Sequence, residues 1–214
     1  MAPWIRCQTV APNPSPVSWD LMARRFVLAS ASPARLQILR AAGFAPEVVV
    51  SGVAEDDVRG EAATVVATLA RRKAEAVPVD NALVLGCDSL LEHTGMLLGK
   101  PGTAVAARAR WQQLRGTNGI LHTGHCLIDT ATGRRAEAVA ATTVRFGTPS
   151  DAEIDAYVAT GEPLAVAGAF TIDGRGAAFV DSIDGDAGTV IGVSSPQFRN
   201  LCSELESEMT SRWA

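Results

Sequence analysis

The stretch "RFVLASASPARLQILRAAGF", residues 25–44, decides the fold class. It opens with an apolar run, residues 25–29, that is typical of a short buried strand. Ser32 then stands where a helix N-cap belongs, Pro33 takes the first helical position, and Gly43 follows the last helical turn. A strand that leads directly into a helix is the first half of a βα unit, so the stretch predicts an α/β fold.

The next segments continue the alternation of strands and helices. "PEVVVSG" (46–52) predicts a second strand, and residues 61–77 form an alanine-rich helical stretch that Pro78 ends. "ALVLGCDSLL" (82–91) is apolar up to Asp88. It therefore predicts a central strand whose carboxyl end presents a carboxylate.

The remainder of the chain adds antiparallel elements. The expected elements are a hairpin at Thr94-Gly95, a surface helix over 103–114, a long hairpin that turns at Thr132-Gly133, a helix from Ser150 with a capping-box Glu153 and a stop at Gly161, short strands in "AFTI" and "AAFVDSI", and a final helix near 195–210. The mixture predicts an α/β fold with a mixed sheet.

Bulk composition limits the classes of function. The 214 residues are 47% hydrophobic and 20% charged with a formal net charge of -4, which is typical of a soluble globular protein. Duplex nucleic acid is excluded as an expected partner because its binding requires many neutralised phosphates. A free nucleotide, which needs only a few cationic residues, stays possible. The chain has no apolar run of about twenty residues, so no membrane span is expected.

The N-terminal segment and the cysteines complete the picture of the chain's organisation. Residues 1–21 are rich in proline and lack the apolar core of a signal peptide, so we expect a flexible extension before a domain over 22–214. The four cysteines contain no Cys-x-x-Cys pair, which indicates reduced thiols in a cytoplasmic protein. They are Cys7, Cys87, Cys126 and Cys202.

The junction inside the opening stretch is a candidate anion site. A strand that ends at a helix N-terminus leaves free backbone N–H groups at the positive end of the helix dipole. Ser30 and Ser32 add hydroxyl donors, and Arg35 can bind phosphate oxygens through its forked guanidinium group. The alternative is an ordinary capped helix with a solvated arginine.

Asp88 and two lysines are candidate catalytic residues. Asp88 follows a run too apolar for a surface, so its carboxylate needs a metal ion, a lysine or a water as partner. A β-turn aspartate is the alternative. Lys100 in "LGKP" stands where the chain returns toward Asp88. Lys73 lies on a mostly apolar helix face, although Arg71 and Arg72 beside it equally allow a solvated basic face.

Two further groups could hold a metal ion. Glu55, Asp56 and Asp57 follow the second strand and would lie at the same sheet end as Ser30 if the strands are parallel, which suits Mg²⁺ or Mn²⁺. An acidic loop in solvent is the alternative. "HTGH" places His122 and His125 three residues apart, but without other ligands they are more typical of polar positions at a strand end than of a zinc site.

The ordered set of motifs resembles the Maf family of nucleoside triphosphate pyrophosphatases, which share the ITPase-like α/β fold. The resemblance runs from about residue 25 to 205. It rests on "LASASPAR", "VAED", "KAEAV", "GCDS", "GKP", "HTGH", "GEPLAVAGAFTIDGRGAAFV" and "GTVIGVS".

This resemblance implies a mixed twisted sheet flanked by helices, with two lobes and a cleft between them, and roles for individual residues. Ser30 and Arg35 would hold the triphosphate, Lys73 and Lys100 would neutralise phosphate charge, and Asp88 would be the acid-base residue. Glu55 would help Asp88 to hold a divalent metal cation, Mg²⁺, Mn²⁺ or Co²⁺. A homodimer is also implied.

Several positions depart from the family's pattern, and they concern substrate specificity. Ala34 and Ser89 stand where the family often has arginine and threonine, and Asp173 stands where it often has glutamine. The usual lysine before the "AG" pair is absent from "LAVAG". Base preference is therefore left open.

Two classes of function fit these residues. The first is an enzyme that hydrolyses a nucleoside triphosphate, non-canonical or in excess, between its α- and β-phosphates. The second is a nucleotide-binding regulator of cell division with little turnover, which the family resemblance also allows. Asp88 together with Lys73 and Lys100 favours the enzyme, because binding alone needs no base. A generic phosphate-binding domain would explain Ser30 but not the ordered set.

Overall fold

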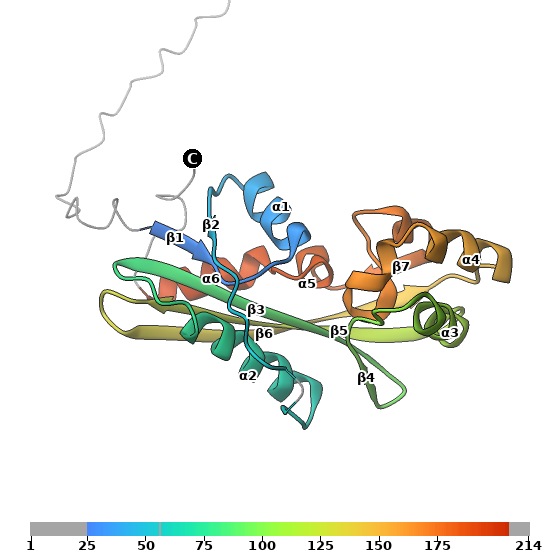
Figure 1. Cartoon of the computed structure of the whole chain (residues 1–214), viewed down its shortest axis with the longest axis horizontal. Coiled ribbons are helices and arrows are strands. Elements are labelled where there is room, and N and C mark those ends of the chain that lie inside the picture. The colour runs from blue at the N-terminus through green and yellow to red at the C-terminus, as the bar shows by residue number, and fades with distance from the viewer. Residues whose placement is uncertain (1–24, 56, 206–214) are drawn as a thin grey trace, which may run out of the picture.

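The computed structural model describes residues 25–55 and 57–205. These residues form a seven-stranded mixed sheet in the order β2-β1-β3-β5-β6-β7, with β4 paired to β3 on the side of β1 (Figure 1). The sheet is flanked by helices, which confirms the mixed α/β fold. Residues 1–21 and Cys7 lie outside the described residues.

Three strands run parallel and the others antiparallel. β1 pairs in parallel with β2 and β3, and every other pairing is antiparallel. The strands are β1 (Arg25–Leu28), β2 (Glu47–Val48), β3 (Ala82–His93), β4 (Met96–Leu98), β5 (Asn118–Asp129), β6 (Arg134–Phe146) and β7 (Val180–Asp184). The expected parallel direction of the first three strands is therefore confirmed, although β3 continues well past the end of β1.

The helices begin at the residues that their capping signals predict. Ser32 accepts a hydrogen bond from the backbone of Arg35, and Ser150 and Glu153 form a full capping box. The α-helices are α1 (Pro33–Ala41), α2 (Ala62–Glu75), α3 (Ala104–Leu114), α4 (Asp151–Ala159), α5 (Ala187–Ile191) and α6 (Ser195–Glu204). The 3-10 helices named below are η2 (Glu162–Ala165), η3 (Ala167–Ala169) and η4 (Arg175–Phe179).

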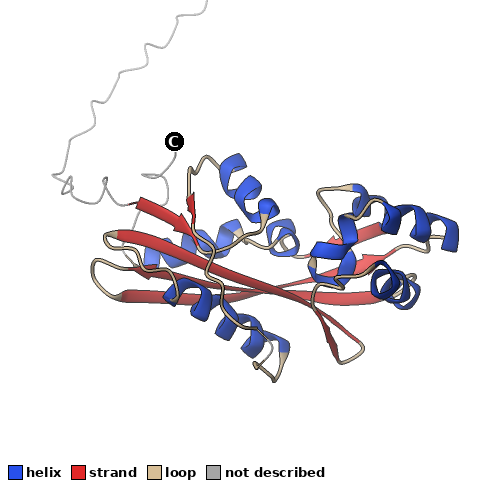
Figure 2. Ribbon diagram, viewed as in Figure 1, coloured by secondary structure: helices blue, strands red, loops and turns tan. Residues whose placement is uncertain are grey.

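Helix α2 packs alone against one face of the sheet, and two glycines let it approach closely (Figure 2). A Cβ on Gly86 would lie 2.2 Å from the carbonyl oxygen of Ala70, and a Cβ on Gly124 would lie 2.2 Å from that of Val66. Both distances are far below van der Waals contact. Glycine in β3 and β5 therefore sets the depth at which α2 rests on the sheet.

The opposite face carries two separate groups of helices at the two ends of the long strands (Figure 1). We call the elements β1, β2, α1, α2, α5 and α6 the α1 half, and the elements β4, α3, α4, η2 to η4 and β7 the α3 half. The α1 half has a core around Leu28, Leu85 and Phe198. The α3 half has its own core around Trp111 and Tyr157. These halves correspond to the two lobes that the resemblance implies.

Two expected strands differ from those observed. Only Glu47–Val48 of the stretch 46–52 pairs as a strand, because β1 ends at Leu28 and offers no further partner. "AFTI" is not a strand: Gly168 and Ala169 have φ of 72° and 66°, which turns the backbone away from an extended path. "AAFVDSI" is a strand only from Val180 onward.

The expected position of Asp88 at a strand end is wrong. β3 continues through Asp88 to His93, because β5 pairs with it along this whole length. A polar residue after an apolar run does not end a strand when pairing with a neighbouring strand, here β5, continues past it.

Candidate active site

The site begins at an interruption in the sheet. On one edge of β3, β1 pairs only with Ala82 to Leu85, and β4 pairs only with Leu91 to His93. Along residues 86–90 no strand among the described residues covers this edge. The segment from β2 to α2 crosses the sheet here from one face to the other (Figure 1). The carboxyl end of β1, the start of α1 and the last turns of α2 therefore meet at an open stretch of β3.

Lys73 links two carboxylates at this edge. Its side chain is 11% exposed, and its Nζ atom lies 2.6 Å from Oδ1 of Asp88 and 2.6 Å from Oε1 of Glu55. The alternative that Lys73 belongs to a solvated basic face with Arg71 and Arg72 is therefore wrong. The close packing of α2 on Gly86 brings Lys73 to β3. The structure thus joins three predicted residues from three different segments.

The two carboxylates differ in their surroundings. Burial raises the pKa of Asp88, and the charges of Lys73 and Arg35 offset only part of this effect. For Glu55, burial also opposes ionisation, but the hydrogen bond and charge of Lys73, with the charges of Lys100 and Arg35, outweigh it and lower its pKa. Asp88 is therefore the carboxylate with the higher affinity for a proton.

Arg35 is buried on the other side of the same edge, where it is held entirely by uncharged groups. Its Nε atom donates to the carbonyl of Gly192 at 3.1 Å. Its terminal nitrogens donate to the carbonyl of Cys87 at 2.8 Å and to the hydroxyls of Ser30 and Ser89 at 3.1 Å each. Since no acceptor is a carboxylate, the positive charge of Arg35 is fixed in place without being neutralised. Such a cation attracts an anion to this edge.

Lys100 approaches from the α3 half. It follows β4, is exposed, and is near enough for its charge to lower the pKa of Glu55. The backbone around it is anchored, because Gly168 donates to the carbonyl of Gly99 and Gly102 donates to that of Leu164. The cationic residues of the site therefore come from both halves.

Comparisons with known proteins identify the family of the chain. The family model described as "Maf-like protein" matches residues 25–205. The chain belongs to the Maf-like family. It is 56% identical over 196 residues to a protein of Streptomyces coelicolor named "Nucleoside triphosphate pyrophosphatase", covering 89% of this chain and 95% of that one.

Two further relatives of the Maf-like chain bear the same name. The protein of Salinispora tropica is 54% identical over 198 residues, which cover 89% of this chain and 88% of the relative. The protein of Mycobacterium sp. strain JLS is 51% identical over 208 residues, which cover 90% of this chain and 99% of the relative. The similarity therefore extends over nearly the full length of each relative.

The residues expected to set specificity lie in different places. Ser89 is in the site, bound to Arg35. Ala34 is half-buried in the first turn of α1, next to Arg35 in the chain. Asp173 is exposed between η3 and η4, and in the described part of the chain it makes no hydrogen bond or ion pair with Lys73 or its partners.

Sequence reasoning missed a second layer of residues around Arg35. Thr123 bonds to the hydroxyl of Ser89 at 2.9 Å and donates to the carbonyl of Thr189 at 2.7 Å. It therefore ties Ser89 to α5. Thr123 lies inside the "HTGH" motif, in which only the two histidines have a spacing that suggests a site, so the sequence gives no separate signal for Thr123.

The two histidines of that motif have separate structural roles in the middle of β5, so the expected position at a strand end is wrong. Nε2 of the buried His125 accepts the backbone N–H of Ser194 at 2.9 Å, and Nε2 of His122 lies 2.9 Å from Glu92 on the other face. Across the described residues, no group of three or more His, Cys, Asp or Glu side chains could hold a metal ion. Burial, together with the charge of Arg35, lowers the pKa of His125 to about 4.

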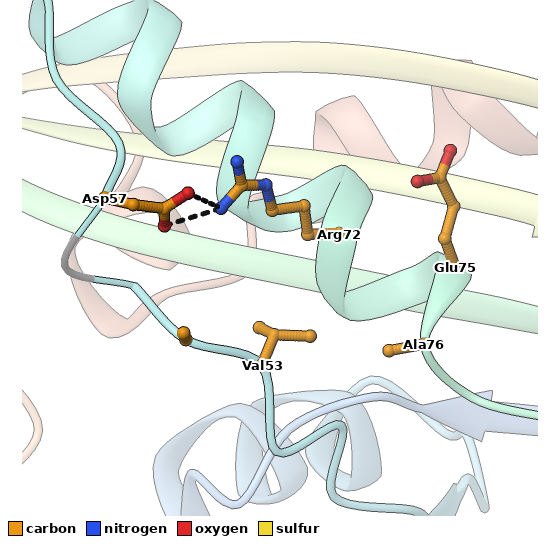
Figure 3. Close-up of a pocket in the computed structure, with 6 residues that line it drawn as sticks. Val53, Asp57, Arg72, Glu75 and Ala76 are labelled. Atoms are coloured by element: carbon orange, nitrogen blue, oxygen red, sulfur yellow. Dashed lines mark hydrogen bonds and ion pairs between the residues drawn. The ribbon is translucent and has the colours of Figure 1, made fainter.

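Asp57 does not join Asp88. It accepts two hydrogen bonds from Arg72, at 2.7 and 2.9 Å, on the exposed side of α2. The pair lies beside a shallow pocket lined by Val53, Ala54, Asp57, Arg72, Glu75 and Ala76 (Figure 3). This pocket holds none of the residues around Lys73 and so is separate from the site. Asp56 lies outside the described residues.

The described cysteines lie in the interior of the protein. Cys87, Cys126 and Cys202 are all buried, and Cys87 and Cys126 are free thiols. Burial raises the pKa of Cys87 to about 11, so its thiol stays protonated beside the site. None of the helices in the described ranges is long and apolar enough to cross a membrane.

Proposed function

We infer that this chain hydrolyses a nucleoside triphosphate to a nucleoside monophosphate and pyrophosphate. The relatives that are 51–56% identical over about nine-tenths of the chain are named nucleoside triphosphate pyrophosphatases. The single observation that carries the inference is Lys73 placed 2.6 Å from both Asp88 and Glu55, at an edge that also holds the uncompensated charge of Arg35. Carboxylates and cations at one edge are the groups that phosphoryl transfer requires.

The cations would bind and orient the triphosphate. Arg35 and Ser30 present a fixed cation and a hydroxyl after β1, and Lys100 supplies an exposed charge from the opposite half. Lys73 adds charge next to the reacting group, where it would also stabilise the negative charge that develops in the transition state. Because Arg35 is already held by four protein acceptors, its position is fixed and one of its five N–H donors is left for a phosphate oxygen.

A divalent cation fits the carboxylates, although they are too few to hold it alone. Lys73 uses one oxygen of each carboxylate, and among the described contacts Oδ2 of Asp88 and Oε2 of Glu55 make no hydrogen bond. Mg²⁺ is commonly held by one or two carboxylates together with substrate phosphates. When bound, such an ion would neutralise phosphate charge; Mg²⁺, Mn²⁺ and Co²⁺ are the ions proposed here.

Asp88 would act as the general base. A water oxygen attacks the α-phosphorus, Asp88 accepts a proton from that water, and the bond from the α-phosphorus to the bridging oxygen breaks with release of pyrophosphate. The raised pKa of Asp88 makes it the better proton acceptor of the two carboxylates. Glu55, whose pKa is lowered, keeps its negative charge for the cation.

Substrate choice is assigned to Ala34, Ser89 and Asp173. An ionised Asp173 accepts hydrogen bonds and cannot donate them, so it would favour a base edge that offers N–H groups. The homodimer and the cytoplasmic location stay predictions. The alternative function, regulation of cell division with little turnover, would require the same binding groups without use of Asp88.

A screen of nucleoside triphosphates decides between these functions. The full chain is incubated with each nucleotide and with Mg²⁺, Mn²⁺ or Co²⁺, and released pyrophosphate and orthophosphate are measured separately. The enzyme hypothesis expects pyrophosphate with at least one nucleotide and loss of activity when EDTA removes the metal. Binding of a nucleotide without release of either product would support the regulator.

A further inference from the structure

The segment from Glu162 to Gly176 is held by a single carboxylate. Oε1 of Glu162 accepts hydrogen bonds from the hydroxyls of Tyr157, at 3.0 Å, and Thr171, at 2.6 Å. It also accepts the backbone N–H of Gly176 at 3.0 Å, and Oε2 accepts that of Arg175 at 3.1 Å. Four donors therefore converge on Glu162, and three of them come from the far end of the same segment.

These hydrogen bonds keep the carboxylate charged. Burial opposes ionisation, but the four donors outweigh it and lower the pKa of Glu162. A hydrogen bond to a charged acceptor is stronger than one between neutral groups. The ends of the segment are thus joined by charge-assisted bonds at positions 162 and 175–176.

Close packing at two glycines leaves the closed segment little freedom. A Cβ on Gly174 would lie 2.8 Å from Oε1 of Glu162, and a Cβ on Gly176 would lie 2.5 Å from the hydroxyl of Tyr157. The backbone therefore approaches Glu162 and Tyr157 more closely than a side chain would allow. Asp173 precedes Gly174 directly, so its position depends on this closure.

The other side of the segment is fixed to the loop that carries Lys100. Gly168 donates to the carbonyl of Gly99 at 3.2 Å, and Gly102 donates to the carbonyl of Leu164 at 3.0 Å. One rigid segment therefore connects a proposed phosphate-binding lysine with a proposed base-selecting aspartate.

We propose that Glu162 is a positioning residue for base selection, because its carboxylate closes the segment 162–176 and so fixes Asp173 relative to Lys100. The proposal rests on the nucleotide-hydrolysing function inferred above. Glu162 does not touch the group around Lys73, so it acts on which nucleotide is chosen rather than on the hydrolytic step.

Glu162→Gln is the variant that tests this role. An amide keeps the size of the side chain but replaces one acceptor oxygen by an NH₂ donor, so at least one of the four donors loses its partner. Glu204→Gln, an exposed position on α6, is the matched control. The kcat/KM ratio between the best and second-best nucleotides is expected to fall roughly tenfold in Glu162→Gln and to stay unchanged in Glu204→Gln.

A double variant separates positioning from simple loss of stability. If Glu162 acts through Asp173, Glu162→Gln changes the ratio in the parent but adds nothing in an Asp173→Ala background. A merely structural role would lower kcat/KM equally for all nucleotides and leave the ratio unchanged. An unchanged ratio in Glu162→Gln, or in Asp173→Ala, would overturn the proposal.

Hydrogen exchange tests the closure without any need for activity. The amides of Arg175 and Gly176 donate to Glu162, so they are expected to exchange roughly tenfold faster in Glu162→Gln than in the parent or in Glu204→Gln. Unchanged exchange would overturn the closure by Glu162 even in an active enzyme. A parent that shows this protection but hydrolyses no nucleotide would instead overturn the proposed function and, with it, the role in base selection.

Discussion

The two halves of the molecule differ in the side chains that they bury. Arg35 and Lys73 of the α1 half are buried beside Asp88 of β3 at the edge of the sheet, and small residues let α2 approach β3 and β5. Both halves also contain aromatic packing: the rings of Phe26 and Phe198 in the α1 half lie 5.3 Å apart, and in the α3 half the Trp111 ring lies 5.8 Å from that of Tyr157 and 5.6 Å from that of Phe179. Buried charges cost stability, whereas aromatic packing provides it.

This difference indicates a division of labour. The α1 half holds the charged residues next to the open edge of β3, and the long strands connect it to the core around Trp111 in the α3 half. Charges on the α3 side are instead paired at its surface, as between Arg108 and Asp155. The comparison predicts that substitutions in the α3 half change stability first and those in the α1 half change catalysis first.

Trp111→Ala is expected to give the largest effect on stability. Trp111 is fully buried, and its Nε1 atom donates to the carbonyl of Ala169 at 2.8 Å. Removal of a large buried aromatic side chain typically lowers the free energy of unfolding by about 3–5 kcal/mol. Urea unfolding measures it, and Val105→Ala, at an exposed position of the same helix, is the control. A loss below about 1 kcal/mol would contradict the role given to the aromatic core.

Asp88→Asn is expected to lower turnover roughly 10²-fold or more, because it removes the general base while keeping the shape of the side chain. Nucleotide affinity should fall much less, since Arg35, Lys73 and Lys100 still bind the phosphates. Steady-state kinetics and equilibrium binding check the two parts, with Asp80→Asn, in an exposed turn, as the control. Turnover near the parent rate would move the base from Asp88 to the acidic loop at Glu55.

The dependence of stability on pH tests the buried, neutral state of His125, whose pKa the charge of Arg35 helps to lower. The pKa of His125 is about 4 in the folded protein and ordinarily about 6.5, so the unfolded chain binds more protons between these values. Stability from His125 is therefore present above pH 6.5 and is lost as the pH falls toward 4, by about 2 kcal/mol at pH 5. His125→Gln, which cannot be protonated, should flatten this part of the stability profile. An equally steep profile in that variant would assign the dependence to other groups.

Substitutions at two helix caps are expected to give the smallest effects. Ser150→Ala removes the cap of α4 and is expected to lower the free energy of unfolding by about 1 kcal/mol without changing kcat or KM. Ser32→Ala removes the cap of α1, where Arg35 begins its contacts, so it should also raise KM. Thermal unfolding and steady-state kinetics on both variants check the contrast. An equal change of KM in the two variants would contradict the expected difference between the two halves.

The local features of this fold could be predicted from the sequence. The caps at Ser32 and Ser150 and the turn at Thr132-Gly133 are formed by residues close in the chain, so their residue types suffice to indicate them. The mixture of strand–helix units and antiparallel hairpins, and therefore a mixed sheet, followed from these signals. So did the candidate residues Ser30, Glu55 and Asp88, because each follows or interrupts an apolar run.

The site itself was decided by the tertiary structure. The Nε atom of Arg35 binds the carbonyl of Gly192, 157 positions later in the chain, and His125 binds Ser194 across 69 positions. Lys73 is buried rather than solvated because Gly86 allows α2 to lie against β3. The length of β3 beyond Asp88 likewise depends on its pairing with β5. Contacts between distant segments have no periodicity or spacing in the sequence, so only the packed chain determines which charges are brought together and which carboxylate retains its proton more strongly.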